Sequence, residues 1–193
     1  MKRSLLALAA FVGAVLGMTS AQASIIHFQT RLSGAAEVPA VATPATGFSL
    51  IDYDDVLRTL FVHVEFSGLI GGAAAAAHIH CCTAPGNNVG VAVGFPGFPA
   101  ATSGVYDHLF DLTDPAVYTA AFRTNFGGGT AAGSEAALIA GLAAPSHRAY
   151  VNIHNATFGG GEIRGLVEVP EPHGLLLAAA ALAALGFATR RRA

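Results

Sequence analysis

Period-two alternation of polar and apolar residues is the feature that most constrains the fold of this chain. In the segment 56–66, every second residue from Leu60 to Phe66 is apolar, and His63 and Glu65 lie between them. Successive side chains of a strand point to opposite faces, so this spacing fits a strand with one buried face and does not fit a helix. The middle of the chain is therefore expected to build a β-sheet.

Further segments show the same alternation or short apolar runs, separated by clusters of glycine and proline. The expected strands are 27–32, 47–52, 56–66, 78–80, 89–95, 104–112, 149–154 and 162–167. One helix is expected at 134–142, where Ser134 can cap strong helix formers, whereas the alanine run 73–77 is expected to be a loop that enters a strand. Many short antiparallel strands with one short helix predict an all-β Greek-key sandwich or flattened barrel. Its core is expected to contain Val62, Val64, Phe66, Ile79, Val151 and Ile153.

The beginning of the chain has the three parts of a secretory signal. Two basic residues are followed by an uncharged apolar run at 5–16, and Ala21 and Ala23 form a small-x-small pattern. Signal peptidase is expected to cut after Ala23, so that residues 1–23 are a signal peptide and the exported chain begins at Ser24. The alternative is a permanent membrane anchor, but a run this short with a cleavage site directly after it argues against one.

The other end of the chain carries a second sorting pattern. The motif Val169-Pro170-Glu171-Pro172 comes first, an apolar stretch at 174–188 follows, and arginines occupy 190–192. In this order the tail, 169–193, resembles the PEP-CTERM sorting signal of Gram-negative bacteria. The resemblance implies that an exosortase-type protease recognises the Pro-Glu-Pro motif, cuts near it and discards the apolar helix. The alternative is a plain C-terminal anchor helix.

Removal of both ends leaves one domain, 24–168, with an acidic composition. It contains no lysine, and five arginines against eleven acidic residues leave a net charge near −6. A domain without a basic patch is a poor nucleic-acid binder, so nucleic acid is not an expected partner. No nucleophile elbow, phosphate loop or carboxylate pair in an acid–base setting appears in the sequence, so no catalytic residue is assigned.

Four short motifs carry a resemblance to a known family. They are Leu32-Ser33-Gly34-Ala35-Ala36-Glu37-Val38-Pro39, Ala77-His78-Ile79-His80, Tyr150-Val151-Asn152-Ile153-His154 and Gly161-Glu162-Ile163-Arg164-Gly165. Over residues 28–167 the chain resembles the CHRD domain, which is named from chordin and is also common in bacterial exported proteins. The resemblance implies an immunoglobulin-like β-sandwich, related in architecture to copper–zinc superoxide dismutase, and no established enzyme activity. The chain departs from the commoner family pattern at Cys81, where a glycine usually follows the His-x-His.

The motifs place polar side chains on one face of the predicted sheet. Alternate residues of a strand share a face, which pairs His78 with His80, Asn152 with His154, and Glu162 with Arg164. The short glycine-rich loop 155–160 is typical of a hairpin, so the last two segments are expected to pair. We therefore expect all six side chains to converge in one polar patch.

Two interpretations of the patch stay open. Three imidazoles with an open position suit copper or zinc, so His78, His80 and His154 are the candidate metal ligands, with Glu162 as a partner that orients an imidazole. Alternatively, the same groups form a structural hydrogen-bond network that needs no ion. A non-enzymatic module of the envelope surface or the extracellular matrix is the main functional expectation, with polysaccharide or surface proteins as partners. A copper or zinc metalloprotein, including a redox enzyme of the dismutase type, is the alternative.

The only cysteines, Cys81 and Cys82, are adjacent. An oxidising compartment allows them to close a vicinal disulfide, which is a small and tight ring. As thiolates beside two histidines they could instead ligate a metal, or they could crosslink two chains. The sequence favours the disulfide without excluding the other two.

Overall fold

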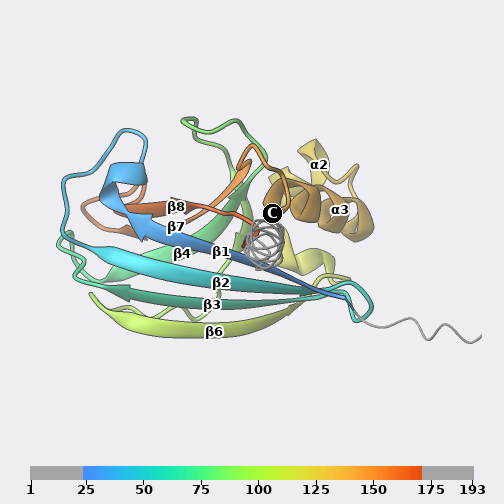
Figure 1. Ribbon diagram of the computed structural model, residues 1–193, viewed down its shortest axis with the longest axis horizontal. Helices are drawn as coiled ribbons and strands as arrows, with labels where there is room; N and C mark the ends of the chain where they lie inside the picture. Colours follow the sequence, from blue (N-terminus) through green and yellow to red (C-terminus); the bar gives the residue numbers. More distant parts are fainter. Residues whose placement is uncertain (1–23, 171–193) are drawn as a thin grey trace, which may run out of the picture.

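The protein, described here from a computed structural model over residues 24–170, is built around one curled antiparallel sheet (Figure 1). The sheet has eight strands in the spatial order β5-β4-β7-β8-β1-β2-β3-β6. The strands are β1 (Ile25–Ser33), β2 (Thr46–Asp54), β3 (Thr59–Ser67), β4 (Ala74–Cys81), β5 (Val91–Gly94), β6 (Gly104–Asp111), β7 (Ala149–Asn155) and β8 (Ile163–Leu166). Two α-helices, α2 (Ala120–Asn125) and α3 (Ala131–Leu142), and two 3₁₀ turns, η1 (Gly34–Ala36) and η2 (Pro115–Val117), complete the described elements.

The sheet folds its two halves around a single core. β1, β2, β3 and β6 form one half through long in-register pairs, and β5, β4, β7 and β8 form the other. Buried residues of both halves, such as Val62 and Ile79, belong to one hydrophobic cluster. Helix α3 packs against β4 and β7 at one end of the sheet (Figure 1). The all-β class is therefore confirmed, as a sandwich or half-barrel made from one continuous sheet.

Each of the eight predicted strands is present, and the predicted core is buried. Val62, Val64, Ile79, Val151 and Ile153 are fully buried, and Phe66 is nearly so. In β3 the burial follows the period-two alternation, because Val62, Val64 and Phe66 face the core and the residues between them face away. Removing a side chain of this size from water stabilises the fold by about 1.5–3 kcal/mol.

Two local expectations were wrong. The alanine run at 73–77 lies mostly in β4, which begins at Ala74 and pairs with β7 from there on. Pairing and burial of Ala74 and Ala77 outweigh the helix propensity of alanine. A second helix, α2, was also not expected; it begins after Thr119, whose hydroxyl accepts from the Phe122 amide, and it buries the Phe122 ring.

The predicted signal peptide and most of the predicted sorting tail lie outside the described residues. Ser24, Val169 and Pro170 are described, whereas Ala23, Glu171 and Pro172 are not. Across residues 24–170, the structure contains no helix with the length and apolar character needed to cross a membrane. Both terminal segments stay predictions from the sequence.

Candidate metal centre

A row of polar side chains crosses β4, β7 and β8 on the face that points away from the core. In the strand register His78 lies opposite Asn152, and Asn152 lies opposite Arg164. Residues directly opposite in an antiparallel pair share a face, and so do their neighbours two positions along the strand. His80 and His154 therefore join the same face. His80, Asn152 and Arg164 are buried there, because loop segments, including the carbonyl of Val89, cover this part of the sheet.

The three histidines of this face meet in space. Their ring centres lie 4.9 Å apart for His78 and His154, 5.5 Å for His78 and His80, and 6.0 Å for His80 and His154. One nitrogen from each ring can be chosen so that the three lie within 4.8 Å of one another. Around a tetrahedral zinc or copper ion, with bonds of about 2.0–2.1 Å, ligand nitrogens are about 3.4 Å apart. The three rings would therefore have to move toward one another to share one ion.

Backbone carbonyls determine which nitrogen of two of these rings carries the proton. His80 Nδ1 lies 2.7 Å from the Val89 oxygen, and His154 Nδ1 lies 3.0 Å from the Gly159 oxygen. A carbonyl oxygen only accepts, so the proton of each neutral ring is on Nδ1 and the lone pair is on Nε2. A carbonyl in this position is the usual outer partner of a metal-bound imidazole.

The nitrogens that remain have no partner within the described chain. Nε2 of His80, Nε2 of His154 and Nδ1 of His78 are all buried without a hydrogen bond. Buried polar atoms in native proteins are nearly always satisfied, and each exception needs an explanation. Three such atoms, all imidazole nitrogens of one cluster, have the composition of a metal ligand set.

Burial keeps the three rings neutral. It lowers the pKa of His78 to about 4, with the neighbouring His154 and His80 adding to the effect. Burial also lowers the pKa of His80, although the Val89 carbonyl and the Asn152 side chain oppose the shift, and it lowers the pKa of His154, although the Gly159 carbonyl opposes it. A metal binds only the unprotonated imidazole. Because these rings are already neutral at neutral pH, they do not have to release a proton before they bind an ion.

The metal-free protein should consequently lose stability in mild acid. The unfolded histidines have a pKa near 6.5 and the folded ones a lower pKa, so the stabilisation is complete above about pH 6.5 and is lost as the pH falls toward 4. Each such histidine contributes a slope of up to about 1.4 kcal/mol per pH unit in that interval. Urea unfolding at a series of pH values measures the slope. It should be smaller in a His78→Gln variant, and an equal slope in both proteins would contradict this origin.

Arg164 lies beside the histidines and is fully committed to other groups. Its Nε and Nη2 donate to Glu37 Oε2 at 3.0 and 2.9 Å, and both side chains are 2% exposed. The guanidinium carbon also lies 4.1 Å from the centre of the Tyr150 ring, and that ring stacks on His80 at 4.6 Å. Burial raises the pKa of Glu37, and the bond to Arg164 opposes the shift. The sequence contained Glu37 and Tyr150 within the family motifs but gave no reason to connect them.

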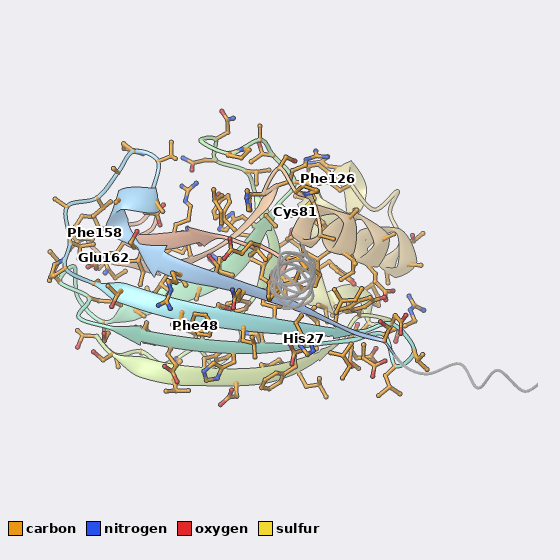
Figure 2. The ribbon with its side chains drawn as sticks, in the orientation of Figure 1. His27, Phe48, Cys81, Phe126, Phe158 and Glu162 are labelled. Carbon is orange, nitrogen blue, oxygen red and sulfur yellow. A yellow bond between two sulfur atoms is a disulfide. The ribbon has the colours of Figure 1, made fainter. Side chains whose placement is uncertain are left out.

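Glu162 does not join the patch, so its expected role in orienting an imidazole is wrong. Its carboxylate accepts from Thr43 Oγ1 at 2.6 Å, from the amides of Ile70 and Gly71 at 2.8 and 3.0 Å, and from Asn155 Nδ2. Burial alone would raise its pKa, but these bonds lower the pKa below the usual range. Figure 2 shows Glu162 beside Phe158 and well away from Cys81. The reason is that β8 begins only at Ile163, so Glu162 precedes the regular alternation.

Asn152 is in the patch but is only partly bonded. Its Nδ2 donates to the Gly160 oxygen at 3.4 Å, and its Oδ1 is buried without a partner. Cys81 and Cys82 form a disulfide with each other, so neither offers a thiolate to an ion. The disulfide packs against α3, where a Cβ on Gly141 would overlap the Cys81 sulfur.

Comparison with known proteins agrees with the motif pattern. The CHRD domain pattern matches residues 28–167. No curated protein and no solved structure shows a significant match to the chain. The matched region begins within β1 and ends at the residue after β8, so it includes most of β1, the other seven strands and the three histidines. Because the match covers well over half of the sequence, the chain belongs to the CHRD domain family.

Proposed function

We propose that this protein is an exported, non-enzymatic CHRD module that binds one copper or zinc ion through His78, His80 and His154. The observation that carries the proposal is the meeting of three buried imidazole nitrogens that have no hydrogen-bond partner. Carbonyl bonds hold two of the rings with their lone pairs free for an ion. Burial favours the neutral form that a metal requires.

A purely structural network explains these atoms less well. Such a network stabilises a fold by pairing donors with acceptors, and a half-satisfied network is worse than an apolar one. Here His80 and His154 each use one nitrogen on a carbonyl and leave the other bare of a well-formed hydrogen bond, although the Asn152 side chain lies close enough to His80 to oppose the lowering of that ring's pKa by burial. An ion shared by the three rings would satisfy all the bare nitrogens at once.

Metal content of the mature protein, purified from its host without chelators, tests the proposal. We expect about one copper or zinc per chain, since one cluster of this kind is present in the described residues. Protein that contains no stoichiometric metal, and takes up none after incubation with copper or zinc salts, would contradict it.

Export to the envelope surface or the extracellular matrix is the second part of the proposal. It is supported by the apolar segment with its cleavage pattern before Ser24, and by the tail 169–193 that resembles a PEP-CTERM signal. The Cys81–Cys82 disulfide is consistent with an oxidising compartment. Signal peptidase and an exosortase-type protease are the processing partners, and extracellular polysaccharide or surface proteins are the partners that this location offers.

Intact-mass measurement of the protein from its host should therefore show two losses. The mature chain should begin at Ser24 and end close to Pro170–Pro172, because each signal is removed after use. A stable species that retains the arginines at 190–192 would rule out the sorting step. A species that retains residues 1–23 would rule out the signal peptide.

A further inference from the structure

The ligand set formed by His78, His80 and His154 carries no charge of its own. The nearby carboxylates are bonded to other groups: Glu37 pairs with Arg164 through Oε2, although its Oε1 is buried without a partner, and Glu162 bonds to loop groups and Asn155. The neighbouring cysteines are joined as a disulfide. Any ion at this site would therefore keep its full charge in a buried position.

Burial of a charge costs free energy that rises with the square of the charge. A divalent ion with neutral ligands thus costs about four times as much to bury as a monovalent ion of similar size. The Tyr150 ring stacks on His80 and also lies against the Arg164 guanidinium, which places a fixed positive charge near the three histidines. The charge of Arg164 is neutralised by the Glu37 carboxylate. The surroundings therefore supply no net negative charge that would favour a divalent ion.

The low solvent exposure of the three ligand nitrogens also favours a monovalent ion. A zinc site with three protein ligands normally keeps a water in the fourth position. Here Nδ1 of His78 and Nε2 of both His80 and His154 are closed to solvent. Copper(I) and zinc(II) both have a filled d shell, but the singly charged copper(I) accepts three nitrogen ligands in a trigonal arrangement without water. Two further acceptors beside the histidines are buried without a partner, Asn152 Oδ1 and Glu37 Oε1, and both are hard oxygen donors that suit copper(I) poorly.

We infer that the ion of this site is copper(I), held by His78, His80 and His154 in a three-coordinate, water-free arrangement. The inference rests on the proposed metal-binding function and specifies its ligand. It assigns no redox step to the protein, since the ion binds in the state in which it is delivered.

Anaerobic competition between the mature, metal-free protein and a coloured copper(I) chelator tests the inference. We expect one copper(I) to pass from the chelator to each chain, and a parallel zinc(II) competition to give an affinity weaker by at least about 100-fold. X-ray absorption of the copper(I) form should show a three-coordinate ion with the outer-shell scattering of imidazole rings and no fourth ligand. His154→Ala should lower the copper(I) affinity by at least about 100-fold, whereas His27→Ala, on the exposed side of β1, should not change it.

The outcomes separate the inference from the function beneath it. Tight binding of zinc(II) or copper(II) with a bound water, together with weak copper(I) binding, would overturn the inference and leave the metal-binding proposal standing. Copper(I) uptake that His154→Ala does not weaken would also overturn it, because the ion would then lie elsewhere. Binding of no ion at all would overturn both.

Discussion

A His80→Ala substitution is expected to abolish stoichiometric uptake of copper or zinc. His80 supplies one of only three ligand nitrogens, and the two that remain, on His78 and His154, cannot close a site of three or four ligands. Metal per chain, measured after dialysis against metal-free buffer, should fall from about one to near zero. An ion that binds only the folded protein stabilises it by about 2.7 kcal/mol at 100 times its dissociation constant, so added metal should raise the melting temperature of the natural protein and not that of the variant.

His27→Ala is the matched control for this experiment. His27 is exposed on β1 and bonds to Asp52 at 2.7 Å, far along the sheet from β4. It should therefore keep full metal uptake. A His80→Ala protein that still holds one ion per chain would show that the three-histidine cluster is not the site. A loss of about 1–3 kcal/mol in stability with no metal effect in either protein would favour the structural network instead.

Replacement of Arg164 by methionine is expected to destabilise the fold by about 3–5 kcal/mol, because it leaves the Glu37 carboxylate buried without its partner. The two side chains are each 2% exposed, and two hydrogen bonds join them. The change also removes the guanidinium from the face of the Tyr150 ring, where it lies 4.1 Å from the ring centre. Urea unfolding of the metal-free protein measures the effect.

Two further variants test the cause of that loss. Glu37→Leu combined with Arg164→Met removes both charges, and it should recover much of the stability that the single substitution loses, because apolar replacement of a buried ion pair is often neutral or stabilising. Arg31→Met changes an exposed arginine and should alter stability by less than about 0.5 kcal/mol. A single Arg164→Met variant as stable as Arg31→Met would show that the buried pair is not required.

The fold class could be predicted from the sequence, because the pattern that specifies each strand lies within a few consecutive residues. Alternation of apolar residues such as Val62 and Val64 with polar ones predicts that a segment is a strand, and it also predicts which face of that strand is buried. Separation of the strands by glycine and proline then leaves a small set of all-β architectures. The pairing of β8 with β1, which closes one continuous sheet, depends on contacts between distant segments and has no local signal.

The same distinction explains how much of the site could be predicted. Strand periodicity places His78 with His80 and Asn152 with His154, and the glycine loop brings β7 beside β8, so the row of side chains could be predicted. Glu162 could not be placed, because the boundary of a strand is its least certain part: Glu162 begins the predicted strand but precedes β8, and its carboxylate bonds to the loops at 43 and 70–71. The link from Arg164 to Glu37 spans 127 residues and appears only in the folded chain.

Anomalous diffraction at the copper and zinc absorption edges, from crystals of the metal-loaded mature protein, tests the central claim most directly. We expect one peak between His78 Nδ1, His80 Nε2 and His154 Nε2, with each nitrogen about 2.0–2.1 Å from the ion. A peak at other residues, or no peak in crystals grown with stoichiometric metal, would contradict it.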